Sequence, residues 1–251
     1  MNDLVSINVP VYNVEKFIAE TMETVVKQSY PNWELLLVED GSTDRTVEEI
    51  AAYLEKTGEQ RIRLIRLPEN AGAAGARNVG MKESRGRYVT YLDADDLWKP
   101  EKLQHQLEFM KKTNCAFSYT GYEFADEKGQ GLGKIVRVPY ELKYREALGN
   151  TTIFTSTVMF DTDKLPREEL MMPLVKSEDT ALWWQILRQG HTAYGLDENL
   201  VYYRRAGKSL SSNKLVAMQR IWNLYTREQL PLVQKLYYFV LWAFRAVRRR
   251  V

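Results

Sequence analysis

Hydrophobic and polar positions in the first hundred residues follow two alternating patterns. Short apolar, β-branched runs predict four buried strands, at residues 4–11, 33–38, 62–67 and 87–92. Between them, apolar residues at helical spacing predict three helices, at residues 14–28, about 43–57 and 71–85. Strands and helices that alternate through short loops are typical of an α/β fold, in which a mostly parallel, doubly wound sheet carries helices on both faces.

The pattern becomes less regular after residue 98, and the elements there predict a mixed region that faces a second substrate. We expect an amphipathic helix at residues 99–113, an aromatic-rich strand with a flexible hairpin at 115–138 and a short helix at 140–148. Two further strands are expected at 150–160 and 200–204, and three more helices at 177–187, 215–228 and 232–250. The expected organisation is one domain over 1–212, with a nucleotide-binding half (1–98) and an acceptor-side half (99–212), followed by an amphipathic helical extension over 213–251.

The fourth predicted strand ends in a cluster of acids, Asp93-Ala94-Asp95-Asp96. A buried strand disfavours charge, so these acids need a partner. Residues two apart on an extended chain point the same way, so Asp93 and Asp95 can face one cation, and oxygen ligands suit Mg²⁺ or Mn²⁺ bridging to a phosphate. Alternatively, Asp95 or Asp96 caps a helix that starts near Pro100.

Polar side chains also follow the first two predicted strands. Tyr12 and Asn13 follow the first, and Glu39 and Asp40 follow the second. Ligands of parallel sheets bind at the carboxyl ends of the strands. Three polar strand ends on one edge therefore favour a ligand site over helix capping alone.

Small residues dominate residues 71–76, at the start of the third predicted helix. A helix start without bulky side chains lets a ligand approach the backbone, and its free N–H groups favour anions. Tight packing of the helix on the sheet is the alternative, and it alone would explain Gly75 and Gly80. A dinucleotide-binding fold is disfavoured, because no Gly-x-Gly-x-x-Gly motif follows the first strand.

Several turns predict helix caps. Asn13 is placed to cap the first helix, Ser42 or Thr43 the second, and Ser177 a later one.

Glu178 and Asp179 follow Ser177 in the first turn of that later helix. They either stabilise the helix dipole or form a carboxylate general base with a neighbour that orients it. Taken alone, this segment favours the dipole interpretation.

The C-terminal quarter of the chain contains two basic segments. Arg204 and Ser209 belong to a strand and a following loop, rich in basic and hydroxyl side chains, that suits an anionic ligand such as a diphosphate, or is simply a solvated loop. The last helix, 232–250, contains aromatic residues and arginines and no acid. It either lies in a membrane interface that contains anionic lipid or packs on the domain or on a second subunit.

Composition excludes several classes of protein. The chain is 45% hydrophobic and 27% charged, as soluble globular proteins are, and its net charge of +2 does not indicate nucleic-acid binding. One cysteine, Cys115, excludes an internal disulfide and a thiolate zinc site, and two histidines disfavour a histidine metal site. With neither a signal-peptide pattern nor a membrane-spanning run, we expect a cytoplasmic location.

Taken together, these segments resemble the family 2 glycosyltransferases with the GT-A fold. The resemblance covers about residues 4–212 and rests on six motifs in order, 10–13, 38–44, 70–80, 93–96, 177–179 and 203–211. The segment 150–159 and the aromatic, basic end are similar to the teichuronic-acid-biosynthesis type of bacterial cell-surface polysaccharide transferases.

The resemblance implies roles for individual residues in binding a nucleotide-sugar. It implies nucleotide-sugar contacts for the residues at the sheet edge and in the basic loop, namely Pro10, Tyr12, Asn13, Glu39, Asp40, Gly72, Arg77, Asp93, Ala94, Asp95, Arg204 and Ser209. Asp95 is expected to touch Mg²⁺ or Mn²⁺ directly, with Asp93 at the ribose or the waters of the metal. Asp179 is expected to be the catalytic base beside Glu178, and Asp96, which matches no role, is left to cap the helix.

The implied reaction is inverting transfer of a sugar, most simply from a UDP-sugar, to a glycan or lipid-linked glycan acceptor. The implied setting is the cytoplasmic face of a membrane, reached through residues 232–251, and a homodimer is compatible with the sequence. Two alternatives remain open at this point: a sugar-nucleotide-synthesising nucleotidyltransferase, and a non-catalytic nucleotide-binding membrane partner.

Overall fold

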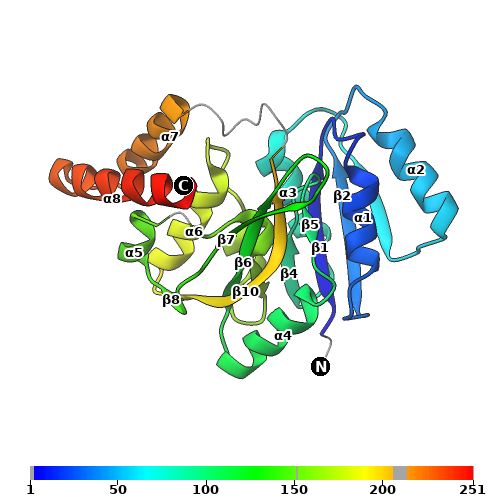
Figure 1. Cartoon of the computed structure of the whole chain (residues 1–251), viewed down its shortest axis with the longest axis horizontal. Coiled ribbons are helices and arrows are strands. Elements are labelled where there is room, and N and C mark those ends of the chain that lie inside the picture. The colour runs from blue at the N-terminus through cyan, green and yellow to red at the C-terminus, as the bar shows by residue number, and fades with distance from the viewer. Residues whose placement is uncertain (1–2, 151, 206–213, 251) are drawn as a thin grey trace.

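A ten-stranded mixed sheet lies at the centre of the computed structural model (Figure 1). The structure describes residues 3–150, 152–205 and 214–250, of which residues 214 and 247–250 are described as backbone only. The main path of the sheet runs β3-β2-β1-β4-β9-β6-β10-β5, and β7 and β8 pair with β6 and β10. The four predicted strands of the first half are confirmed to within one residue at each end, as β1 (Val5–Val11), β2 (Trp33–Glu39), β3 (Ile62–Arg66) and β4 (Tyr88–Tyr91).

These four strands are parallel, and the strand order reverses at β1. Their carboxyl ends therefore lie on one edge, with a switch point between β1 and β4, where ligands of such sheets bind. The second half is mixed, as predicted. Its strands are β5 (Leu97–Trp98), β6 (Phe117–Ala125), β7 (Gly131–Val136), β8 (Glu141–Leu142), β9 (Met159–Asp161) and β10 (Ala193–Arg204).

Strand β10 begins seven residues before the predicted start at residue 200. The polar residues Asp197, Glu198 and Asn199 interrupt its apolar pattern, and the register with β6 shifts on either side of Asn199. A bulge explains the difference, because it lets a strand continue through residues that do not alternate between two faces.

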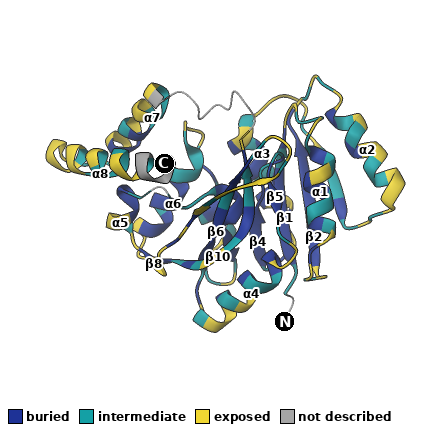
Figure 2. Cartoon of the chain, in the orientation of Figure 1, coloured by how far each residue is buried: buried dark blue, intermediate teal, exposed yellow. Residues whose placement is uncertain are grey.

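Helices cover both faces of the sheet, as the alternation of elements predicts. One hydrophobic core lies under α1 (Ile18–Val26), α2 (Thr46–Thr57) and α4 (Lys102–Thr113). The other lies under α3 (Gly72–Glu83), α5 (Tyr144–Leu148), α6 (Glu178–Arg188) and α7 (Lys214–Arg227). Figure 2 shows the central strands buried between these layers and much of the last helix, α8 (Leu232–Arg250), exposed. Short 3₁₀ turns, η1 (Thr155–Thr157) and η2 (Arg167–Leu170), complete the described elements.

Helix α3 packs closely on β1, as one of the two interpretations of its small residues predicted. A Cβ atom at Gly80 would lie 2.8 Å from Asn8 Oδ1 of β1. Gly80 is thus explained by packing, whereas Gly72, at φ +73, has open space where a side chain would be. Helix α3 is therefore tightly packed on the sheet at Gly80 and open at its start.

Two of the predicted caps are wrong. Helix α1 begins at Ile18 with Phe17 in the cap position, so Asn13 does not cap it. Helix α2 begins at Thr46, whose backbone N–H donates to Asp44 Oδ1 at 3.0 Å, so neither Ser42 nor Thr43 caps it. Ser177 does occupy the cap position of α6, although its own side chain makes no capping hydrogen bond in the described structure.

Asp96 does not cap a helix either. Helix α4 begins at Lys102, with Glu101 in the cap position, and Asp96 is fully buried in front of it. Lys102 is also fully buried: Nζ donates to Thr90 Oγ1 at 2.9 Å and lies 3.8 Å from the Trp98 ring centroid. Burial lowers the pKa of Lys102 well below its usual value.

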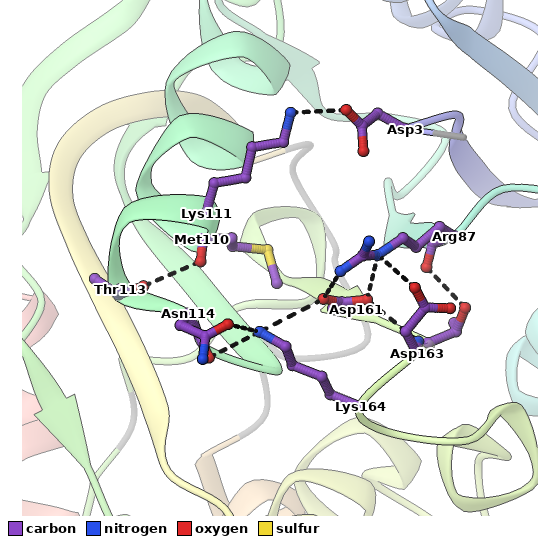
Figure 3. A network of polar contacts seen from close by, with 10 residues as sticks. Asp3, Arg87, Met110, Lys111, Thr113, Asn114, Asp161, Asp163 and Lys164 are labelled. Atoms are coloured by element: carbon purple, nitrogen blue, oxygen red, sulfur yellow. Dashed lines mark hydrogen bonds and ion pairs between the residues drawn. The ribbon is translucent and has the colours of Figure 1, made fainter. Parts of the chain in front are cut away.

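Two sets of ion pairs lie at the amino ends of the parallel strands (Figure 3): one joins the start of β4 to β9, and the other joins the start of β1 to α4. Arg87 contacts Asp161 at 2.7 Å and Asp163 at 2.9 Å, and Lys111 contacts Asp3 at 2.8 Å. The first set stabilises the junction between the parallel and antiparallel parts of the sheet.

Within the residues that the structure describes, no helix combines the length and apolarity needed to cross a membrane. Helix α7 contributes Ile221, Leu224 and Tyr225 to the second core, so the C-terminal extension is packed on the rest of the protein. The boundary at 212/213 remains a prediction.

Candidate active site

Polar residues predicted at the ends of β1 and β2 join the loops that follow β1, β2 and β3. Asn13 Oδ1 accepts from Thr43 N at 2.8 Å, and Asn13 N donates to Ser42 Oγ at 3.1 Å. Asp40 Oδ1 accepts from Ala71 N, at 2.6 Å, just before α3. The predicted convergence of these loops on one edge of the sheet is therefore observed, and Asn13 fastens two of them together.

The nucleotide-binding residues expected on this edge differ in how open they are. Tyr12 is half exposed, and Gly72 leaves open space at the start of α3. Asp40 is buried with one oxygen committed to Ala71, so its expected contact with a nucleobase depends on the other oxygen. Glu39 is buried and already paired, because it accepts from Ser42 N and lies 3.6 Å from Arg66. Pro10 lies within β1, opposite Val38 of β2.

The acids after β4 have different surroundings. Asp93 Oδ1 accepts from Arg77 Nη2 at 2.6 Å, and Asp93 N donates to Ser156 Oγ at 3.0 Å. In the described structure, no other side chain is hydrogen-bonded to the Asp95 carboxylate. Burial, together with the charge of Asp93, raises the pKa of Asp95 to about 6. Ala94 is buried between them, and its carbonyl oxygen accepts from Thr21 Oγ1.

Arg77 joins the acids after β4 to the acids at the start of α6. Its Nη1 donates to Glu178 Oε1 at 3.0 Å, while its Nη2 holds Asp93. Burial alone lowers the pKa of Arg77, but its hydrogen bonds and the nearby carboxylates raise it above the ordinary value, so the guanidinium stays charged. The structure thus brings together two pairs of carboxylates that lie far apart in the sequence.

The turn η1 contacts both pairs. Thr155 Oγ1 donates to Asp179 Oδ2 at 3.1 Å, and Ser156 Oγ donates to Asp96 Oδ2 at 2.5 Å while accepting from Asp93 N. All three residues of η1 are buried. This turn therefore fixes the position of Asp179 relative to the Asp93-to-Asp96 segment.

Asp96 is buried and supports the site through its hydrogen bonds. Its second oxygen, Oδ1, accepts from Arg204 N at 3.1 Å, and so it ties the end of β4 to the end of β10. Burial and the charges of Asp95 and Asp93 raise the pKa of Asp96 well above its usual value. The predicted capping role is replaced by this internal one, which also explains why a third acid is present.

Arg204, expected to contact a diphosphate, is buried and paired within the protein. Its Nη2 donates to Glu20 Oε2 of α1 at 2.6 Å, and its Nη1 donates to the carbonyl oxygen of Glu127 at 2.9 Å. A direct contact with a diphosphate would compete with these bonds and remains a prediction. Ser209, from the same expectation, lies outside the residues that the structure describes.

Comparison with known sequences decides the family. The sequence signature described as "Glycosyl transferase family 2" matches residues 6–163. Bacillus subtilis TuaG is 42% identical to this chain, over 99% of this chain and 98% of TuaG. TuaG is named as a teichuronic acid biosynthesis glycosyltransferase. The chain is a family 2 glycosyltransferase.

A second relative and two solved structures are also similar to this glycosyltransferase. Escherichia coli WfgD, named as a UDP-Glc:alpha-D-GlcNAc-diphosphoundecaprenol beta-1,3-glucosyltransferase, is 36% identical over 88% of this chain and 85% of its own. S. aureus TarS with UDP-GlcNAc superposes with a TM-score of 0.70 at 22% identity, over 96% of this chain and 72% of that one. The mannosyltransferase PcManGT from Pyrobaculum calidifontis, in complex with GDP-Man and Mn²⁺, superposes with a TM-score of 0.73 at 18% identity, over 99% of this chain and 71% of that one. These structures confirm the GT-A fold.

The glycosyltransferase has side chains that could supply some, but not all, of the ligands of a divalent cation. Asp93 and Asp95 are the available ligands, and the described residues contain no cluster of three or more His, Cys, Asp or Glu side chains placed to hold a metal. Asp93 keeps one oxygen apart from Arg77, and burial next to Asp93 makes the charge of Asp95 costly without a cation. Two carboxylates suit an ion whose other ligands come from water and a diphosphate.

Sequence reasoning missed several residues of this site in the glycosyltransferase. Thr155 and Ser156 lay in a segment that was noted without a role, and Glu20, the partner of Arg204, was not noted. Three consecutive hydroxyl residues between the apolar pairs Ile153-Phe154 and Val158-Met159 were the available signal for η1. Nothing near Glu20 in the sequence signals its partner, which lies 184 residues away.

Proposed function

We propose that this glycosyltransferase moves a sugar from a UDP-sugar to a hydroxyl of a lipid-linked glycan in the synthesis of a bacterial surface polysaccharide, with inversion at the anomeric carbon. The observation that carries the proposal is the Arg77 bridge. It joins Asp93, two residues before Asp95, to Glu178, the neighbour of Asp179, with hydrogen bonds of 2.6 Å to Asp93 and 3.0 Å to Glu178. The names of TuaG and WfgD support the acceptor class, and UDP in the complex of TarS supports the donor.

Asp179 is the proposed general base. Thr155 Oγ1 donates to Oδ2 and the Thr180 backbone N–H donates to Oδ1, so the carboxylate has a fixed orientation. A fixed carboxylate can accept the proton of an acceptor hydroxyl while the hydroxyl oxygen attacks. Glu178 accepts a hydrogen bond from Arg77 instead. It therefore positions the start of α6 and leaves proton transfer to Asp179.

The transfer is a single displacement. The acceptor oxygen forms a bond to the anomeric carbon as the bond from that carbon to the diphosphate oxygen breaks, and the electron pair leaves with the nucleoside diphosphate. The acceptor proton passes to Asp179. Attack from the face opposite the leaving group inverts the configuration, as in inverting glycosidases.

Asp93 and Asp95 are the proposed ligands of Mg²⁺ or Mn²⁺. A bound divalent cation supplies charge stabilisation for the leaving diphosphate. Asp93 is held by Arg77 and by Ser156, which lets it face the donor without moving. Tyr12, Asp40 and Gly72 line the adjacent strand ends, where the nucleoside is proposed to bind.

Two alternatives compete with this proposal less well. A nucleotidyltransferase would want a Gly-rich, basic loop after the first strand, and Tyr12 and Asn13 stand there. A partner that has lost catalysis would not need Asp179 to be oriented by Thr155. The family assignment favours transfer over both alternatives.

A donor screen tests the proposal. The full chain is incubated with UDP-sugars and GDP-mannose, with Mn²⁺ or with a chelator, and release of the nucleotide is measured with and without an undecaprenyl-diphosphate-linked sugar. We expect cation-dependent release from one UDP-sugar, stimulated by the acceptor, and a product of inverted configuration. Release from GDP-mannose alone would contradict the UDP assignment, and retained configuration would contradict the single displacement.

A further inference from the structure

The last helix, α8, is apolar on two sides, and only one of them is covered. Tyr238, Phe239 and Trp242 pack against the second hydrophobic core. Arg245 Nη1 donates to the carbonyl oxygen of Gly149 at 3.0 Å and fixes the far end of the helix. The prediction that α8 packs on the domain is therefore confirmed for this side.

The opposite side of α8 is an exposed apolar stripe made by Val233, Leu236, Tyr237 and Val240, which we name the α8 outer face. These side chains are between 50% and 78% exposed. Their spacing of three and four residues places them on one side of a helix. An exposed cluster of this kind is uncommon on soluble monomers and marks a binding surface.

Charge distinguishes between the possible occupants of this surface. Residues 213–251 contain eight Lys and Arg and one Glu, which gives +7, so with +2 for the whole chain the remaining residues carry −5. The helix itself has no acid between Leu232 and Arg250. Two copies that met through this extension would bring like charges together, whereas an anionic lipid surface would attract it and repel the acidic remainder of the protein.

Helix α8 is connected through α7 to α6, the helix that begins with Glu178 and Asp179. Tyr225 of α7 stacks on Trp184 of α6, with ring centroids 5.3 Å apart and planes 9° apart, and donates from its hydroxyl to the carbonyl oxygen of Leu148 at 2.7 Å. Tyr238 of α8 packs beside Tyr225. Docking through α8 would thus hold the catalytic helix at a defined height and orientation.

We propose that the α8 outer face is a membrane-docking surface, which inserts Val233, Leu236, Tyr237 and Val240 at the interface of a bilayer rich in anionic lipid. Apolar insertion and attraction of basic residues act together in such interfacial helices. The protein is then a peripheral enzyme with its acidic domain turned away from the lipid. The inference needs no glycosyl transfer, so its test is independent of the proposed function.

Co-sedimentation of the full chain with vesicles tests this proposal. The vesicles are pure phosphatidylcholine, or phosphatidylcholine with 40% phosphatidylglycerol, at low and high salt. We expect binding to the anionic vesicles, weakened by salt, and at least tenfold weaker partitioning to pure phosphatidylcholine. Val240→Asp places a charge within the stripe and is expected to reduce partitioning at least tenfold.

Gln234→Asp is the matched control, because it adds the same charge at an exposed position beside the stripe. We expect it to reduce partitioning by about fivefold at most, which is the electrostatic share of one charge. Circular dichroism establishes that both variants fold. Equal losses in the two variants, or no binding of the unchanged protein to anionic vesicles, would overturn the proposal. So would a dimer, seen by light scattering, that Val240→Asp dissociates, because the face would then be a subunit interface.

Discussion

Arg77 and Glu178 lie 101 residues apart in the sequence and form an ion pair of 3.0 Å in the fold. The same guanidinium holds Asp93, so one buried side chain bridges the proposed metal ligands and the proposed catalytic pair. Only a planar, two-pronged cation can reach both carboxylates at once. The arrangement of the active site thus depends on Arg77.

Replacing Arg77 by Lys is expected to reduce turnover at least a hundredfold, because an ammonium group cannot keep both carboxylates in position. Removing one partner of a buried ion pair costs about 3–5 kcal/mol, so Arg77→Ala is expected to destabilise the fold as well. Steady-state kinetics and thermal unfolding measure the two effects. Arg87→Lys is the matched control, because Arg87 also bridges two carboxylates but at the amino ends of the parallel strands. Equal turnover loss in both lysine variants would contradict the specific role of Arg77.

Thr155 is expected to orient Asp179. Thr155→Val removes the hydroxyl that donates to Oδ2, and we expect kcat to fall about tenfold, corresponding to one hydrogen bond, with KM for the donor unchanged. Thr155→Ser is expected to restore most of the rate. In the control, Thr157→Val, the lost hydroxyl donates to the carbonyl oxygen of Phe154, the residue just before the turn, and among the described residues it has no hydrogen bond to Asp179. A similar kcat for Thr155→Val and the unchanged enzyme would exclude the positioning role.

Lys102→Met is expected to stabilise the protein, by about 1 kcal/mol or more. Lys102 is fully buried, so its folded-state pKa is lowered, and protonation favours the unfolded chain. Between that lowered pKa and about 10.5, the value of an exposed lysine, the unchanged protein therefore loses stability as the pH falls. Methionine removes this dependence, so the advantage of the variant grows toward lower pH. Denaturant unfolding between pH 6 and 9 measures it, and a pH-independent difference would contradict the mechanism.

Asp95→Ala is expected to abolish the cation-dependent part of nucleotide binding. Burial and the charge of Asp93 raise the pKa of this carboxyl, so its charged form is costly and a cation beside it would offset that cost. Calorimetric titration of UDP, with and without Mn²⁺, compares the variant with the unchanged enzyme. Asp163→Ala, at an exposed acid near the start of β4, is the control. Equal and metal-independent affinities in all three proteins would exclude a metal role for Asp95.

The parallel half of the sheet could be predicted because its strands are short apolar runs separated by clear turns. The convergence of Tyr12, Asp40 and Asp93 was also predictable, since parallel strands place their carboxyl ends on one edge. This follows from topology and requires no knowledge of side-chain partners.

Hydrogen-bond partners far away in the sequence account for most of what was not predicted. Asp96 was assigned to a helix cap from its neighbours, yet it bonds to Ser156 and to the backbone of Arg204. Asn13 likewise bonds to the loop at Thr43. Local patterns reveal that a polar residue can form a cap, and long-range packing determines whether it does.

Turnover of Asp179→Asn, measured beside its affinity for UDP, tests the central claim most directly. Asparagine keeps the shape of the side chain and cannot accept the acceptor proton. We predict a loss of transfer of at least a thousandfold, with UDP affinity in the presence of Mn²⁺ within about twofold of the unchanged enzyme. Transfer that stays within tenfold of the unchanged rate would show that Asp179 is not the general base and would contradict the proposed mechanism.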